Sequence, residues 1–306
     1  MGIFSRQKQQ NNWFEISENQ YHDIYNKYGG SFVTHPITIK TASEIAKIKT
    51  KYLGYTDQES QELIAAIPCW DKYFAGSHTY FKKNRLPTPF DLGDSEIILP
   101  LAPNHKFSLP LKIEFLSLLH KINVINCKIS KKFELCLAKS NFDSVNKLSR
   151  KFKYNQRREL RILQNAGGVI KPISELSPAE ISAIYQELFI TRWGFEPLGI
   201  NNLPKQLMLL HDFLVGSVLY LNNKPIAIQL VFAIESPDWI SASYVNGAYD
   251  QTVKEFSPGS VLTYLNTLEL DEHAINSNKQ LRFCFGKNDA EYKLRWCYTE
   301  PLFETT

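Results

Sequence analysis

Hydrophobic positions recur with two periods along this chain, and the pattern is clearest after residue 146. Spacing of three to four residues predicts helices, whereas alternation and short apolar runs predict strands. The predicted helices cover 146–165, 177–193, 203–214 and 261–275, with a helix-like segment at 290–296. The predicted strands cover 169–173, 216–220, 225–234, 239–248 and 281–285. This succession of helices and strands indicates an α/β fold (α+β, with a mixed sheet) that carries helices on its faces.

Signals at the helix ends support this interpretation. Gly167 and Gly168 follow the first of these helices, and glycine is common just beyond a helix C-terminus. The second helix is preceded by Ser177, has Pro178 in its first turn and carries Glu180 three residues after the serine. That combination is typical of a capped helix N-terminus.

The first half of the chain has a less regular pattern. Residues 1–20 are polar and predict a flexible N-terminus. The elements expected after it are helices at 18–28, 41–48 and 111–124 and strands at 51–55, 61–70, 96–101 and 133–138. Residues 84–110 are rich in proline.

The length of 306 residues fits two domains of ~150 residues each. The change in pattern places the boundary near residues 140–150. We therefore expect a flexible segment at 1–20, an N-terminal domain at 21–145 and a C-terminal domain at 146–306. Apolar residues make up 43% and charged residues 22% of the chain, which favours globular structure over disorder.

Charge and cysteine content narrow the functional class. A net charge of +4 is too small to indicate nucleic acid by itself. The five cysteines lack C-x-x-C spacing, which predicts reduced, buried thiols in a reducing compartment. The N-terminus lacks the apolar stretch of a secretory signal, and no run of ~18 apolar residues predicts a membrane span. These observations favour a cytoplasmic protein.

The first candidate site is the loop at 256–260, before the helix at 261–275. A helix N-terminus exposes unpaired N–H groups with partial positive charge, and Gly259 lets a ligand approach the backbone. Ser257 and Ser260 can add hydroxyl donors, and Val261 begins the helix. We interpret these residues as a cofactor-binding site for a pyrophosphate. An ordinary capped helix explains the same sequence.

The second candidate site is the closing segment at 283–296. A central strand ends at Gly286, and a short polar loop then leads to Tyr292 and Lys293. Ligands of open sheets bind beyond the ends of central strands. Tyr292 is a candidate catalytic acid toward a leaving thiolate, and Lys293 is a candidate partner for phosphate. The alternative is a surface helix in which Tyr292 and Trp296, four residues apart, pack on the core.

The third candidate is the basic stretch at 147–161, which holds seven Lys or Arg residues against one Glu. It could contact nucleotide phosphates, RNA or an anionic lipid surface, with nucleic acid the less favoured partner. A solvated helix face is the alternative. The residues predicted to bind an anion or substrate are Lys153, Arg157, Arg158 and Arg161.

Other chemistry has weaker support. Glu235 and Asp250 flank the hairpin of strands 225–234 and 239–248, and Glu235 is the candidate catalytic base, although exposed turn carboxylates explain both. The histidines show no metal-ligand spacing, and the motifs of serine hydrolases and P-loop enzymes are absent. We therefore expect no metal.

Several of these segments resemble the Fem-like transferases of the GNAT superfamily. The matching parts are the basic helix at 151–158, the Ser-Pro-Gly-Ser loop at 257–260 and the ending at 283–296. Cys284 departs from the pattern, because Asp is common at that point. The resemblance implies a GNAT-like acyltransferase fold, as two GNAT-like halves in tandem with a degenerate N-terminal one.

A more extensive resemblance is to the Mig family of macrophage-inducible proteins that confer antimicrobial-peptide resistance. It covers residues 20 to 303 and rests on segments at 28–36, 151–161, 191–195, 216–219, 225–230, 256–262 and 285–296. The resemblance implies a role in bacterial virulence and resistance to cationic antimicrobial peptides. It also implies peripheral association with the inner face of the inner membrane.

Together these observations favour an N-acyl or aminoacyl transferase. The resemblance implies acyl-CoA or aminoacyl-tRNA as the donor and an envelope component or small molecule as acceptor. The donor phosphates would lie at 257–260, and strands 225–234 and 239–248 would splay apart to hold the pantetheine or the acceptor. The alternative is a non-catalytic GNAT-like protein that serves as a membrane-associated scaffold or a transcriptional regulator.

Overall fold

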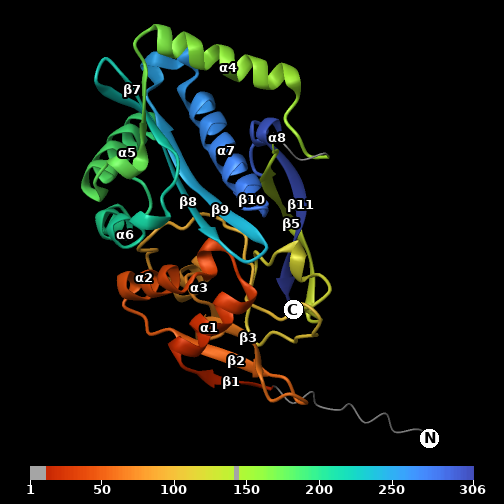
Figure 1. Cartoon of the computed structure of the whole chain (residues 1–306). Coiled ribbons are helices and arrows are strands. Elements are labelled where there is room, and N and C mark those ends of the chain that lie inside the picture. Colours follow the sequence, from red (N-terminus) through yellow and green to blue (C-terminus); the bar gives the residue numbers. More distant parts are fainter. Residues whose placement is uncertain (1–11, 141–144) are drawn as a thin grey trace, which may run out of the picture.

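The computed structural model describes residues 12–140 and 145–306 as a four-stranded and a seven-stranded sheet with their helices (Figure 1). The smaller sheet is antiparallel, in the order β1-β2-β3-β4, and lies in the N-terminal part. Its strands are β1 (Trp13–Ile16), β2 (Lys51–Thr56), β3 (Leu63–Trp70) and β4 (Tyr73–Phe74). The helices of this part are α1 (Glu18–Tyr28), α2 (Pro36–Ala46) and α3 (His78–Asn84).

The larger sheet has the order β11-β5-β10-β9-β8-β7-β6. Strands β9 and β10 pair in parallel, and the other neighbours pair antiparallel. Its strands are β5 (Cys127–Ala138), β6 (Val169–Pro172), β7 (Ser217–Leu221), β8 (Lys224–Glu235), β9 (Trp239–Tyr249), β10 (Gln280–Lys287) and β11 (Cys297–Thr305). The helices of this part are α4 (Arg150–Asn165), α5 (Pro178–Trp193), α6 (Leu203–Leu209), α7 (Pro258–Asn276) and α8 (Lys293–Trp296).

Helices cover both faces of the larger sheet, which explains why its interior strand β8 is apolar at most positions. Side chains alternate between the faces of a strand. Phe232 packs in the cluster that contains Tyr185 and Phe189 of α5, whereas Val231 packs in the cluster that contains Tyr264 and Leu270 of α7. The sheet is thereby buried between α5 and α7.

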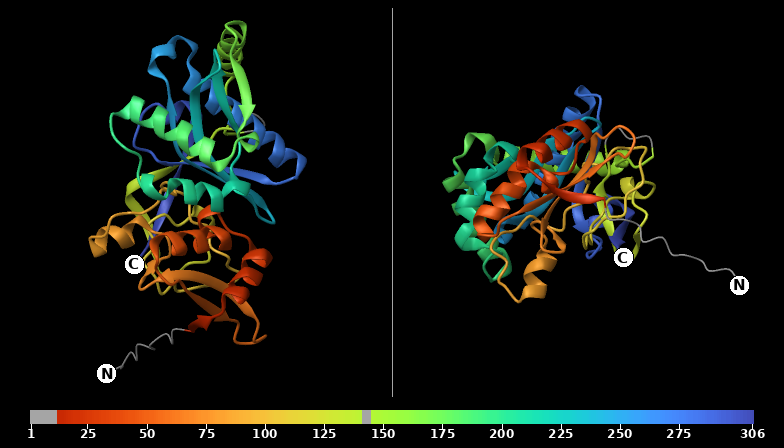
Figure 2. Two further views of the ribbon diagram at one scale, coloured as in Figure 1. Left: turned by 90° about the vertical axis from the view of Figure 1, so that its left-hand side faces the viewer. Right: turned by 90° about the horizontal axis from the view of Figure 1, so that it is seen from below.

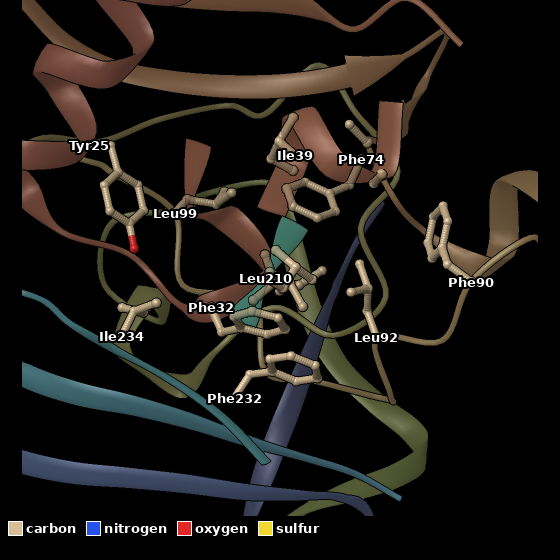
Figure 3. Close-up of a cluster of buried hydrophobic side chains, with 14 of the residues drawn as sticks. Tyr25, Phe32, Ile39, Phe74, Phe90, Leu92, Leu99, Leu210, Phe232 and Ile234 are labelled. Atoms are coloured by element: carbon tan, nitrogen blue, oxygen red, sulfur yellow. The ribbon is translucent and has the colours of Figure 1, made fainter. Parts of the chain in front are cut away.

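The N-terminal part packs against one end of the larger sheet, as two further views show (Figure 2). Gly30 makes the contact, because its carbonyl accepts hydrogen bonds from Ser236 Oγ at 2.8 Å and Trp239 Nε1 at 2.8 Å. A Cβ at Gly30 would lie 2.4 Å from Thr34 Oγ1, so no larger residue fits. The nearby Phe32 ring stacks on Phe232 of β8 with centroids 4.8 Å apart, in a shared core (Figure 3).

A buried ion cluster also joins the two parts. Arg282 of β10 is 2% exposed and donates to Glu96 and, at 2.8 Å, to Glu300 of β11. Ser117 Oγ donates to the same Glu96 carboxylate. Burial disfavours the charge of Arg282, but the two carboxylates outweigh this effect and raise its pKa above the ordinary value.

The predicted mixed α/β fold is confirmed, and most predicted elements after residue 146 are present. The sequence missed α3 and β11 and placed the start of α2 five residues too late. Strand β5 precedes residue 145 and yet lies in the larger sheet, between β11 and β10. The domain division at 145 and the tandem repeat stay predictions.

Three expectations for the first half are wrong. Residues 96–101 form no strand but only isolated bridges at Ile97 and Leu101. Residues 111–124 form no α-helix but an irregular segment with a 3-10 turn at Leu118–His120. The reason is pairing with distant chain, since Leu116 exchanges backbone hydrogen bonds with Phe303 of β11 at 3.0 Å. Residues 13–20, expected to be flexible, form β1 and the start of α1, and β1 pairs with β2. Residues 1–11 lie outside the described residues.

Candidate functional site

An open cleft of about 390 Å³ lies where β9 and β10 separate. The two strands pair from Gln280↔Trp239 to Cys284↔Ser243, and beyond that point β9 continues beside β8 alone. The cleft is lined from β8 and β9, the start of α7, the end of α5 and α8. The lining residues are Arg192, Gln229, Tyr244, Tyr249, Lys254, Ser257, Pro258, Gly259, Ser260, Thr263, Tyr292 and Trp296.

The separation of β9 and β10 corrects one expectation. The sequence predicted that the strands at 225–234 and 239–248 would splay apart. They correspond to β8 and β9, which pair from Ala227↔Tyr249 to Glu235↔Ile240 with one irregularity. The opening lies instead at the parallel pair, since the chain after β9 turns away into the 3-10 segment Gln251–Phe256 and α7.

The predicted loop at 257–260 lies on the cleft wall. Ser257 adopts a left-handed conformation with φ of 49° and its side chain does not cap α7. Gly259 is needed for packing, because a Cβ there would lie 3.1 Å from the Tyr249 ring. The N–H groups of Ser260 and Val261 both donate to the Ser257 carbonyl, at 2.9 and 3.0 Å. The Val261 side chain is fully buried against the core and does not reach the cleft.

A chain of buried amides fixes the start of α7 against the sheet. Gln229 of β8 is 5% exposed, and its Nε2 donates to Thr263 Oγ1 at 2.7 Å. The Gln229 Oε1 accepts from Asn266 Nδ2 at 2.9 Å. Thr263 Oγ1 donates in turn to the Gly259 carbonyl at 2.8 Å. Because each buried polar group has a partner, the first turn of α7 is held in one position.

The cleft is electropositive, since its described lining includes Arg192 and Lys254 but no Asp, Glu or His. Arg192 is half-buried at the end of α5, with its guanidinium 4.3 Å from the Trp193 ring centroid and 4.4 Å from that of Tyr249. Its Nη1 donates to the Gly247 carbonyl at 3.0 Å. A cation held in this way favours an anionic ligand.

Tyrosines line the opposite wall. Partial burial raises the pKa of Tyr292 above its ordinary value, although Lys293 and Arg192 oppose this shift. Burial likewise raises the pKa of Tyr244, whose ring stacks on Phe285 at 5.0 Å. Both phenols therefore stay protonated near neutral pH and can donate hydrogen bonds or a proton.

Besides Val261, the predicted residues Lys293 and Glu235 do not reach the cleft. Lys293 is nearly buried, and its ammonium contacts Asp289 at 2.7 Å and donates to the Lys287 carbonyl at 2.8 Å. Glu235 lies at the far end of β8, six residues from Gln229, or about 20 Å along a strand. It pairs there with Lys279 at 2.7 Å, and the hydrogen bond lowers the pKa of Glu235. The structure thus brings Tyr292 to the cleft but not Glu235.

The basic helix α4 borders the cleft without lining it. It lies across the end of α7 that is near the cleft (Figure 1), with Phe152 against Trp296 at 4.8 Å. Arg157 and Arg161 line a separate shallow hollow with Tyr154 and Leu160. Arg158 pairs with Glu159 at 2.8 Å. The backbone carbonyl of the half-buried Lys153 accepts a hydrogen bond from Arg157 Nε.

Sequence reasoning missed Arg192, Tyr249 and Gln229 as site residues. Arg192 stands in the segment 191–195, where a cation is followed by Trp193 and Phe195, so an Arg-aromatic signal was present. Its contact with Tyr249, 57 residues later, depends on tertiary structure. Gln229 lies in an apolar strand, and a polar residue there could have indicated a buried network.

Comparisons with solved structures define the class of fold. FemX matches over 95% of this chain and 96% of its own, with 10% identity and a TM-score of 0.55. L-PGS from Bacillus licheniformis matches at 9% identity over 95% and 92% of the two chains, with a TM-score of 0.47. A GCN5-related N-acetyltransferase-like protein from Streptococcus suis 89/1591 matches at 10% identity over 94% and 99%, with a TM-score of 0.35. The FemX match shows that the chain has the fold of FemX.

The family follows from the sequence. The Mig-14 family profile matches residues 35–305, which is most of the chain, and the protein belongs to that family. The resemblance to the Mig and Fem-like proteins is confirmed at this level. No curated protein matches the chain.

Residues 12–140 and 145–306 contain no group of three His, Cys, Asp or Glu side chains placed to hold a metal ion. No helix in the same ranges combines the length and apolar character needed to cross a bilayer.

Proposed function

We propose that the protein is an acyltransferase that binds an activated acyl or aminoacyl donor in the cleft between α7 and α8. The observation that carries this proposal is the meeting of the 257–260 loop with Tyr292 across an electropositive opening between two parallel strands. Such an opening can admit an extended ligand between the strand ends. Acyl-CoA and aminoacyl-tRNA are the donors that the fold favours.

Transfer would need positioning and one proton donor. The acceptor nitrogen attacks the donor carbonyl, so a C–N bond forms while the C–S or C–O bond to the leaving group breaks. Tyr292 is placed to give its phenolic proton to the departing thiolate or alkoxide, and the proton of the acceptor nitrogen passes to solvent. Ser257, Ser260 and the Gly259 N–H can position the donor through hydrogen bonds.

The proposal extends to the biological role. An envelope-type acceptor would lose a charge or change its packing on acylation, which would reduce binding of cationic peptides. Support comes from membership of the Mig-14 family and from the FemX fold. We propose a cytoplasmic location, peripheral to the inner membrane, on the same grounds.

A thermal-shift screen tests the donor. Ligand that binds the native state raises the melting temperature by mass action. We expect a rise with acetyl-CoA, a longer acyl-CoA or an aminoacylated RNA end, and a smaller rise with free CoA. If none of these ligands moves the melting temperature, the donor assignment is wrong.

A second function is favoured by the position of α4. Its arginines Arg157 and Arg161 face a hollow outside the cleft, so they are available to a different partner. In this alternative the protein is a non-catalytic scaffold or regulator that binds an anionic surface through α4. Binding to anionic vesicles or RNA that persists when the cleft is blocked would favour it.

A further inference from the structure

Arg192 differs from three other cations of limited exposure, Arg282, Lys293 and Lys279. Arg282 pairs with Glu96 and Glu300, Lys293 with Asp289 and Lys279 with Glu235. Arg192 forms no ion pair with any residue in the described ranges, and its Nη1 donates to a neutral group, the Gly247 carbonyl. Enclosed charges in proteins are generally paired. The unpaired guanidinium therefore suits an anion that arrives with the ligand.

The neighbours of Arg192 hold it ready for such a ligand. Two aromatic rings contact the guanidinium, and the Gly247 carbonyl takes one of its five N–H groups. The backbone carbonyl of Arg192 accepts from Gln251 Nε2 at 3.1 Å, which ties the end of α5 to the segment before α7. Because the Arg192 side chain is already held in place, ligand binding restricts it little further, and the entropic cost of binding is low.

The start of α7 has fewer free backbone N–H groups for an anion than the sequence predicted. Pro258 has no N–H, and the N–H groups of Ser260 and Val261 already donate to Ser257. Gly259 retains the one free N–H of this first turn among the described residues. Charge recognition in the cleft must therefore come mainly from side chains.

We propose that Arg192, assisted by Lys254, is the anion anchor of the cleft and that the ligand bound there carries a phosphate or carboxylate. A guanidinium presents paired N–H groups that match either oxyanion. The inference rests on the proposed function, because the same cleft would bind the donor. It assigns the charge-recognition role to the α5 end instead of the α7 start. A phosphate would belong to the donor and a carboxylate to the acceptor.

Calorimetric titration with inorganic pyrophosphate and with succinate separates these sources. The variants are Arg192→Gln, which keeps a hydrogen-bond donor but removes the charge, and Arg192→Lys, which keeps the charge but loses the paired N–H groups. Arg85→Gln is the control, an exposed arginine outside the cleft. We expect one of the two anions to bind the wild type. Its affinity should fall at least tenfold in Arg192→Gln, less in Arg192→Lys and not at all in the control.

Unchanged affinity in a folded Arg192→Gln variant, or no binding of either anion to the wild type, overturns the anchor. If Arg192→Gln does not fold, Lys254→Gln replaces it, because Lys254 is exposed, and affinity equal to wild type again overturns the proposal. The outcome is separable from the proposed function. A donor that stabilises wild type and Arg192→Gln equally leaves the transferase standing without the anchor. Anion binding that depends on Arg192, without binding of any donor, supports the anchor and contradicts the donor-binding proposal.

Discussion

At the scale of single residues, the cleft depends on side chains that are polar but not acidic. Tyr292 is half-exposed beside Arg192, and its raised pKa keeps the phenol protonated. Cys284 cannot take this role, because it is buried and does not line the cleft. Tyr292 is therefore the residue on which proton transfer can be tested.

Replacement of Tyr292 by Phe removes the proton and keeps the ring. We expect kcat to fall about 100-fold, with donor affinity changed less than about threefold, because general-acid catalysis contributes about this much. Thiol release from the donor that stabilises the protein most is the measurement. Tyr249→Phe serves as a control from the same cleft. Equal rates in Tyr292→Phe and wild type would remove Tyr292 from the mechanism.

The sequence predicted correctly the cleft residues that local pattern marks. It did not predict which charged residues are paired with partners elsewhere in the chain. Ser257, Gly259 and Tyr292 follow a strand or open a helix, and such positions are visible in the sequence. Lys293 looked equivalent to Tyr292, yet Asp289 binds its ammonium. Glu235 looked like a free base, yet Lys279, 44 residues later, pairs with it. Whether a charge is free or paired depends on contacts that local pattern does not carry.

At the scale of elements, capping and periodicity predicted α5 and α7 well. Ser177 and Glu180 form the capping box that the sequence indicated, and Gly194 ends the helix in the left-handed conformation. The helix predicted at 111–124 is absent because the backbone of this segment forms hydrogen bonds with β11 and with Ile97 instead of along a helix. A regular hydrophobic pattern does not show whether its segment forms a helix or pairs with a strand that is distant in the sequence.

Helix α4 gives a prediction at this scale. Arg157 and Arg161 are exposed without a carboxylate partner in the described ranges, whereas Arg158 is paired with Glu159. The double change Arg157→Gln and Arg161→Gln should weaken binding to anionic vesicles about 30-fold, since each basic residue near such a surface contributes about 1 kcal/mol. Cosedimentation at low and high salt measures it. The matched control Arg158→Gln should have a smaller effect, and equal effects would contradict the assignment.

At the scale of the whole molecule, charged groups buried between the two parts hold the fold. Glu96 and Ser117 come from the N-terminal part, and Arg282 and Glu300 come from the larger sheet. Local sequence pattern does not indicate this pairing, because its members lie up to 204 positions apart. The mixed sheet was predictable from pattern, but the joint between the two parts was not.

Glu96→Gln tests the ion cluster. It leaves Arg282 with one carboxylate in a buried site, and loss of one partner of a buried pair costs about 3 kcal/mol of unfolding free energy. Urea denaturation provides the value. Lys128→Gln removes the exposed pair with Glu304 and should cost less than about 1 kcal/mol. A Glu96→Gln variant as stable as the control would show that the cluster contributes little.

His120 makes stability depend on pH. Burial, with Arg282 nearby, lowers the pKa of His120 to about 3, and its Nε2 accepts the Leu99 N–H at 2.8 Å. The unfolded chain therefore binds the proton first, so stability is complete above about pH 6.5 and is lost as pH falls toward 3. This group should cost about 2 kcal/mol at pH 5 relative to pH 7. Urea denaturation at both values, repeated with His120→Gln, should show a smaller difference in the variant, and an identical difference would exclude His120.

The central claim is that the cleft beside the start of α7 binds the acyl donor. Calorimetric titration of the most stabilising donor into wild type, Gly259→Trp and Asn276→Trp tests it most directly. Gly259→Trp fills the cleft wall, whereas Asn276→Trp adds the same side chain at the exposed far end of α7. The account predicts that binding is lost in Gly259→Trp and kept in Asn276→Trp. Undiminished binding to a folded Gly259→Trp protein would contradict it.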